Sequence, residues 1–290
     1  MNNGSAFQQI GQATVARIFE ISATFPASKL LPDFDPALVR PDPADRSPSD
    51  PEGSQLNVSI HSWLVRIGNL TVLIDAGIGN GKRRSSKLFD HLATPWLDRL
   101  AAAGARPEDV THVLLTHLHT DHVGWNTIPG NGGWVPTFPN ARTYLPRRGY
   151  ELFMSLEGRA RPNYDMFADS VLPVIAAGRA EFVSPEGGEV LAGFTYLPTP
   201  GHSPDHMSIL LNSDGQEALF AGDVLHNPVQ VTHPDWCSMY CESHEEARRS
   251  RQRMLELAAD RNIPWFSSHC AETSIGTVSR DGDHFAWTFR

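Results

Sequence analysis

Residues 111–124, THVLLTHLHTDHVG, decide how this sequence is interpreted, because a short apolar segment leads directly into a dense group of polar side chains. The segment THVLLT predicts a buried strand, and His117, His119, Asp121 and His122 follow it within six residues. At a spacing of two, extended backbone points the rings of His117 and His119 in the same direction. Imidazole and carboxylate are ligands that zinc and other first-row divalent ions prefer, so the run predicts a metal site.

Further candidate ligands stand where other apolar segments end. Asp75 closes TVLID, His202 follows FTYLPTPG, Asp223 closes EALFAGD and His269 follows IPWFSS. In a layered α/β protein the ends of strands converge on one edge, where residues distant in sequence can meet. Together with the first run, these positions predict more ligands than one metal ion takes.

The composition indicates a globular chain without a nucleic-acid partner. Lys and Arg number 24 and Asp and Glu 33, a net charge of −9, and basic residues gather only in short pieces such as 82–84 and 248–251. Neither a signal peptide nor an apolar run of membrane-spanning length is evident, so we expect a cytoplasmic protein with no membrane partner. The three cysteines, Cys237, Cys241 and Cys270, cannot all pair within one chain.

We expect one catalytic domain over residues 56–290, preceded by an arm and Pro-rich loop over residues 1–55. Pro, Asp and Ser crowd residues 32–54, which favours an extended, turn-rich segment. A hairpin is predicted over 56–74 with its turn at Gly68 and Asn69, and helices are predicted near 86–103, 147–156, 163–177 and 244–261. Strands are expected at 111–116, 142–146, 194–199, 206–212, 217–223 and, as the last one, 263–268, with a loop at 124–140.

The motifs HLHTDH, TPGHS, FAGD and SSH, in this order between about residues 56 and 270, resemble those of the metallo-β-lactamase superfamily. The resemblance implies an α/β fold, the four-layer αβ/βα sandwich, with two divalent metal ions at the edges of its sheets. Zinc is the ion we expect, and manganese, cobalt and iron stay open.

The resemblance also assigns roles by motif position. It implies a first metal site of His117, His119 and His202, a second of Asp121, His122 and His269, and Asp223 as the bridge between them. Asp75 matches an aspartate that orients a ligand without binding metal. The implied reaction is hydrolysis of an ester-type bond of a small molecule by a metal-bridging hydroxide, with Asp121 and Asp223 guiding protons.

The substrate must be inferred from residues around the metals. Relatives that open acyl-homoserine lactones carry a tyrosine three residues after the bridging aspartate, where this sequence has His226. The stretch GDVLHNPVQV looks more like the branch with methyl parathion hydrolase and related lactonases and arylesterases. We therefore expect a lactone or an aryl ester, with a phosphotriester as the alternative, and His226 as a candidate catalytic group on the substrate side.

Aromatic residues in loops beside the motifs are candidates for the wall of an apolar pocket, although each could equally cap a core edge. They are Trp125, Trp134, Phe138 and Trp236.

Other interpretations stay open at this point. Persulfide dioxygenases resemble the same motif set but bind a single iron, and a noncatalytic zinc site would have a closed shell of four ligands. The C-x3-C spacing of Cys237 and Cys241 allows a separate metal or redox site. A homodimer held by the N-terminal arm is a further hypothesis.

Overall fold

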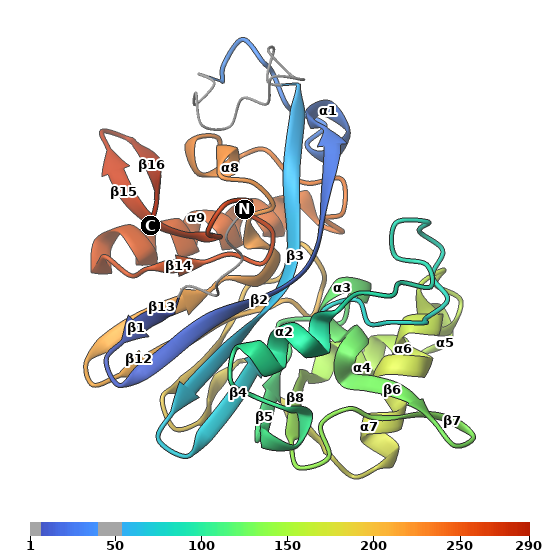
Figure 1. The fold of residues 1–290 in the computed structure, drawn as a ribbon. Helices are drawn as coiled ribbons and strands as arrows, with labels where there is room; N and C mark the ends of the chain where they lie inside the picture. Colours follow the sequence, from blue (N-terminus) through green and yellow to red (C-terminus); the bar gives the residue numbers. More distant parts are fainter. Residues whose placement is uncertain (1–6, 40–53) are drawn as a thin grey trace. The chain divides into compact units, whose positions relative to one another are not determined.

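The computed structural model describes residues 7–39 and 54–290, and in this part of the chain the strands form two seven-stranded sheets and one small hairpin (Figure 1). The first sheet has the order β1 (Gln8–Ile10), β2 (Ala13–Pro26), β3 (Gln55–Ile67), β4 (Leu70–Ile74), β5 (His112–Leu114), β8 (Arg142–Pro146) and β9 (Ala180–Val183). The second has the order β10 (Gly188–Leu191), β11 (Phe194–Pro198), β12 (Met207–Ser213), β13 (Gln216–Phe220), β14 (Trp265–Phe266), β15 (Ile275–Asp281) and β16 (His284–Phe289). The hairpin is β6 (Thr127–Gly130) with β7 (Gly133–Pro136).

The helices are mostly short. They are α1 (Ala27–Leu30), α2 (Trp96–Ala102), α3 (Thr120–Val123), α4 (Arg147–Met154), α5 (Leu156–Arg159), α6 (Tyr164–Ser170), α7 (Leu172–Ala176), α8 (Val229–Thr232) and α9 (His244–Arg261). Single 3-10 turns cover Pro107–Asp109, Gly124–Asn126 and Gly222–Val224. Among the described residues, no helix combines the length and the apolar character that crossing a membrane requires.

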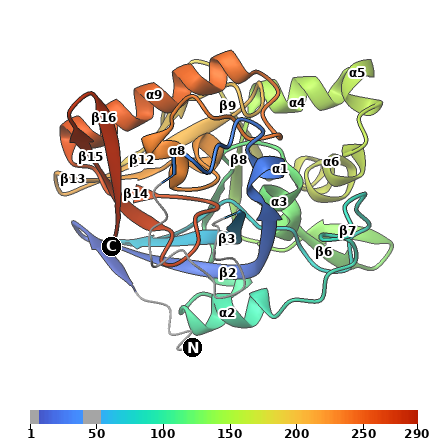
Figure 2. The same cartoon turned by 90° about the horizontal axis from the view of Figure 1, so that it is seen from above.

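The described residues form two compact units. The first unit comprises residues 60–198 and 209–217 with the described part of 1–21, and the second comprises 199–208 and 218–290 with the described part of 22–59. In the core of the first unit, the buried rings of Trp96 and Trp125 stack with centroids 5.1 Å apart. In the second unit, α9 packs against β15, which pairs with β16 (Figure 2).

Several predicted elements are confirmed. Strands β3 and β4 form the expected hairpin, with Gly68 at its turn in the left-handed region (φ 56°). Helix α9 has the bounds expected for the helix near 244–261: the Ser243 side chain accepts a hydrogen bond from the backbone N–H of Glu246 at its start, and Asn262 ends it with φ 51°.

Other predicted elements were wrong. The helix predicted from residue 86 begins only at Trp96, because the residue before Pro95 is driven away from helical backbone. The loop predicted at 124–140 contains the hairpin β6–β7.

The sequence analysis also missed strands at both ends of the chain. Strands β15 and β16 follow the strand predicted to be the last, and β1 and β2 lie in the segment predicted to be an arm. The domain boundary at residue 55 stays a prediction, and residues 40–53 of the Pro-rich loop lie outside the described residues.

Parallel pairing brings strand ends together within each unit. In the first unit β4 runs parallel to β5, so Asp75, the residue after β4, donates its backbone N–H to the carbonyl oxygen of Leu114 at 2.9 Å. In the second unit β13 runs parallel to β14, and the N–H of Ala221 donates to the carbonyl oxygen of Phe266 at 3.0 Å. The chain that follows each of these strands carries the predicted ligands.

Candidate metal centre

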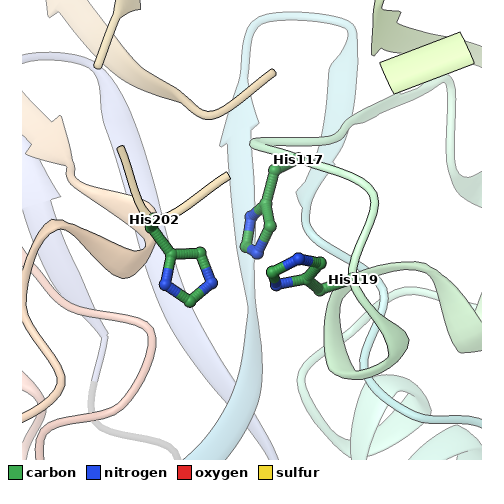
Figure 3. Close-up of side chains that lie close together, drawn as sticks. All are labelled: His117, His119 and His202. Carbon is green, nitrogen blue, oxygen red and sulfur yellow. The ribbon is translucent and has the colours of Figure 1, made fainter. Parts of the chain in front are cut away.

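The first unit gathers one cluster of predicted ligands, His117, His119, Asp121 and His122, directly after β5. The ring of His117 lies 4.5 Å from that of His119 and 4.1 Å from that of His122, between ring centroids. Figure 3 shows the His117 and His119 rings side by side, as their spacing of two predicts. Asp121 places a carboxylate oxygen 3.8 Å from Nε2 of His122, so imidazole and carboxylate ligands face a common region.

Asp75 fixes how two of these rings are protonated. One carboxylate oxygen of Asp75 accepts hydrogen bonds from the backbone N–H and the hydroxyl of Thr116, and the other lies 2.8 Å from Nδ1 of His122. A carboxylate only accepts, so Nδ1 of His122 carries the proton and Nε2 keeps the lone pair. Because the Thr116 hydroxyl gives its proton to Asp75, its oxygen accepts from Nδ1 of His117 at 3.0 Å, which leaves Nε2 as the lone-pair nitrogen there too.

The second unit gathers the other cluster around the carboxylate of Asp223. One carboxylate oxygen, Oδ2, lies 3.0 Å from Nε2 of His269, 3.2 Å from Nε2 of His202 and 3.5 Å from Nε2 of His226. All four side chains are buried. Asp223 follows β13, His269 follows β14, and His202, drawn in Figure 3, lies in the turn after β11.

Two other histidine contacts separate a ligand from a structural residue. Nδ1 of His269 donates to the carbonyl oxygen of Ser59 at 3.0 Å, which leaves Nε2 as the ring nitrogen that faces Asp223. The ring of His206 is oriented in the same way but its Nε2 faces backbone: Nδ1 donates to the carbonyl oxygen of Thr199 at 3.0 Å, and Nε2 accepts from the backbone N–H of Asp223 at 2.8 Å. Both nitrogens of His206 therefore hold backbone groups, which is the environment of a structural histidine.

The donor set fits divalent metal ions. His117, His122 and His269 each have Nδ1 held by a hydrogen bond to oxygen, which is how metal-ligating histidines are usually oriented. In the second unit the Nε2 atoms of His269, His202 and His226 lie within 3.5 Å of one carboxylate oxygen of Asp223, so nitrogen and oxygen ligand atoms converge there. Nitrogen and carboxylate ligands of this kind suit zinc and related ions.

His226 lies within the second cluster of candidate ligands. Together with His202 and Asp223 it forms a buried group whose possible ligand atoms all lie within 4.8 Å of one another. Burial lowers the pKa of His226 below its ordinary value, which favours the neutral ring. Gln230, which the sequence analysis did not single out, accepts from the backbone N–H of His226 at 2.7 Å and is fully buried.

The four aromatic candidates for the pocket wall do not share one environment. Trp125 and Phe138 are core residues of the first unit, 2% and 4% exposed, and the indole N–H of Trp125 donates to Glu20 at 2.7 Å. Trp236 packs in a core cluster of the second unit, with Phe34 at 5.4 Å. These three rings are buried, whereas the partly exposed ring of Trp134 lies 3.6 Å from Nζ of Lys82. A wall role for the four aromatic residues stays a prediction.

The cysteines do not join the ligand clusters. Cys237, Cys241 and Cys270 are buried and free, and Cys237 and Cys241 hydrogen-bond to each other through their thiols. Within residues 7–39 and 54–290, the groups able to hold a metal contain no cysteine.

Comparisons with known proteins agree with the motifs. The model of the metallo-beta-lactamase superfamily matches residues 57–264. An N-acyl homoserine lactonase of Bacillus cereus is 27% identical over 175 residues, which cover 56% of this chain and 62% of that protein. The lactamase-like protein nscB of Neosartorya fischeri is 30% identical over 188 residues, 64% of this chain and 43% of that protein. The chain thus spans about three fifths or less of the length of these relatives.

Solved structures resemble the chain over its whole length. The hydrolase AbOPH of the beta-lactamase superfamily superposes with a TM-score of 0.83 at 25% identity and covers 100% of this chain and 98% of its own. AidC, a dizinc quorum-quenching lactonase in complex with a product, gives a TM-score of 0.80 at 19% identity and covers 100% of this chain and 99% of its own. The predicted metallo-β-lactamase fold is confirmed.

Proposed function

The chain belongs to the metallo-β-lactamase superfamily, and from that premise we propose that it is a hydrolase in which the two ligand clusters together hold two divalent ions, zinc foremost, and cleave an ester-type bond. His117, His119 and His202 would hold the first ion, Asp121, His122 and His269 would hold the second, and Asp223 would be shared between them. The proposed substrate is a lactone or an aryl ester.

The observation that carries this proposal is the orientation of three histidine rings. His117, His122 and His269 each turn Nε2 towards other candidate ligands because Nδ1 is held by Thr116, Asp75 or Ser59. His206 has Nδ1 held in the same way, but its Nε2 is occupied by the backbone N–H of Asp223, which separates it from these three. Their common pattern supports a ligand role for each.

When bound, the two ions would supply a nucleophilic hydroxide near neutral pH and polarise the substrate's carbonyl oxygen. The chain's own residues position this chemistry. Asp121, with its side chain 18% exposed, is the more accessible of the two carboxylates, whereas Asp223 is 4% exposed. Asp121 is therefore placed to pass a proton to the leaving oxygen, and buried Asp223 holds charge at the centre of the second cluster.

The choice of ester substrates follows the relatives named above, which include N-acyl homoserine lactonases. His226 stands beside Asp223 with its ring in the neutral form, where it is able to donate a hydrogen bond to a substrate oxygen. A phosphotriester remains the second candidate because the same metal pair can act on a phosphoryl centre.

The test combines metal analysis with a panel of lactones, aryl esters and phosphotriesters. We expect about two zinc, manganese or cobalt ions per chain and turnover of at least one lactone or aryl ester. His119→Ala should abolish turnover and lower the metal content while the fold is retained, and His284→Ala, an exposed histidine on β16, should change neither.

Two results would reject the proposal. Unchanged turnover in His119→Ala would refute the metal model. One iron per chain together with oxygen uptake would replace hydrolysis with a persulfide dioxygenase activity.

A further inference from the structure

The loop of residues 233–243, which joins α8 to α9, is hydrogen-bonded to the backbone of a proposed ligand. The N–H of Glu242 donates to the carbonyl oxygen of His202 at 3.0 Å, and the N–H of Ser243 donates to that of Gly201 at 2.9 Å. Gly201 has φ 130°, and a Cβ there would lie 2.0 Å from the backbone nitrogen of Ala247, so only glycine allows α9 to start this close. These two hydrogen bonds hold the end of the loop next to His202, a member of the second cluster.

The start of the same loop is tied to His226. Buried Gln230 accepts from the N–H of His226 at 2.7 Å and donates from its amide nitrogen to the carbonyl oxygen of Trp236 at 2.9 Å. In mid-loop, the N–H of Met239 donates to the carbonyl oxygen of Leu30 at 2.9 Å. Hydrogen bonds to its backbone thus anchor both ends and the middle of the loop, so the path of the loop backbone is held.

Tyr240 is the aromatic residue that this loop presents next to the ligands. Three rings follow one another: His226 lies 5.4 Å from His269 with an interplanar angle of 16°, and Tyr240 lies 6.4 Å from His226 with an angle of 26°. His269 and His226 are 3% exposed, whereas Tyr240 is 46% exposed. Tyr240 is therefore the outer, accessible ring of a row that ends at Asp223.

The side chain of Met239 adds a second apolar group to the surface at Tyr240. Met239 is 44% exposed beside Tyr240, so a thioether and an aromatic ring lie together at the surface next to buried ligands. Exposed apolar side chains cost free energy in water, and adjacent ones beside a site are typical of ligand contact. Thioether and phenol ring both pack well against flexible or aromatic groups.

We propose that Tyr240, with Met239, contacts the apolar acyl or aryl group of the substrate and so determines specificity. The inference rests on the proposed ester hydrolysis and names the part of the substrate that this site selects. Tyr240 is a different residue from the four aromatic candidates of the sequence analysis, of which Trp236 lies four residues earlier and packs in a core cluster.

The experiment compares aryl esters that differ only in acyl length, an acetyl and a decanoyl ester, in the wild type, Tyr240→Ala and Tyr240→Phe. For the decanoyl ester we expect Tyr240→Ala to lower kcat/KM about five- to tenfold through KM, because a ring contact is lost. The acetyl ester should be turned over as before, and Tyr240→Phe should restore the decanoyl value because the ring does the packing. Phe7→Ala, which removes an aromatic ring 49% exposed in the first unit, is the matched control.

Calorimetric binding of decanoate and acetate provides a readout that does not depend on turnover. Decanoate binding should weaken in Tyr240→Ala and not in Tyr240→Phe, with the metal content unchanged. Equal losses for long and short ligands, loss of metal, or no change would each overturn the role of Tyr240. If the wild type cleaves no ester but decanoate binding still depends on Tyr240, the proposed ester hydrolysis fails while the apolar contact stands.

Discussion

Asp75→Asn tests the reasoning about histidine protonation most directly. Asp75 has φ 57°, in the left-handed region that asparagine tolerates better than most residues, so this substitution leaves the backbone unstrained. The amide oxygen can still accept from the N–H of Thr116, now 2.8 Å from the carboxylate. The amide nitrogen then faces Nδ1 of His122, where the carboxylate oxygen stood at 2.8 Å.

The expected loss follows from this exchange of acceptor for donor. To avoid two facing N–H groups, His122 must move its proton to Nε2, and the lone pair proposed to bind metal is given up. Losing such a supporting carboxylate costs about 10- to 100-fold in metal affinity, which corresponds to about 1.4–2.8 kcal/mol. Without metal, the free energy of unfolding should fall by about 1–3 kcal/mol because a charged acceptor at a buried position is lost.

The assay is zinc binding measured by competition with a chelator, alongside urea unfolding of the metal-free protein. Asp214→Asn is a closely matched control, because Asp214 also has positive φ (52°) but is exposed in a turn. The control should change neither quantity by more than about 0.5 kcal/mol. Wild-type zinc affinity in Asp75→Asn would refute the claim that Asp75 sets the protonation of His122.

Three other substitutions test structural claims. Burial lowers the pKa of Lys82 from 10.5 to about 8, so between these pH values the unfolded chain binds more protons than the folded chain. The free energy of unfolding should therefore rise with pH across that range. In urea titrations at several pH values, Lys82→Met should not show this rise. Glu20→Gln places an amide donor among the N–H groups that donate to Glu20, which include the indole N–H of Trp125. The free energy of unfolding should fall by about 1–3 kcal/mol. A wild-type value would show that the carboxylate is not needed. His206→Gln can still bridge Thr199 and Asp223, so we expect two bound ions by metal analysis; loss of an ion would identify His206 as a ligand.

The fold was predictable where local signals agreed with the tertiary structure. Helix α9 begins at a Ser243 cap and ends at Asn262, and both signals are visible in the sequence. The hairpin of β15 and β16 had a signal too, since Asp281, Gly282 and Asp283 form a turn sequence, but its strands are less apolar than the core strands. Strands β1 and β2 were missed because the nearby Pro-rich segment suggested an arm.

The aromatic residues of the site were not predictable by the same route. Trp125 and Phe138 lie in a Gly- and Pro-rich segment that reads as a surface loop, yet Glu20, more than a hundred residues away from Trp125, holds the indole N–H inside the core. Tyr240 is exposed instead of buried. Nothing in the sequence around it distinguishes it from Trp236, and only the folded structure shows that one ring is accessible and the other buried. Whether a loop residue is exposed depends on contacts with residues distant in sequence, such as that of Trp125 with Glu20, and the local sequence does not reveal these contacts.

Residue type and strand position were enough to select the candidate ligands, but not the hydrogen bonds that orient their rings. His202 and His206 stand four residues apart, and the motif alone distinguishes them. In the structure the distinction is physical: His206 uses one nitrogen on Thr199 and the other on the N–H of Asp223, so it has no lone pair left for a metal. By accepting from that N–H, His206 holds the backbone of the residue whose carboxylate we propose as the bridge, so a residue outside the proposed ligand set positions a proposed ligand.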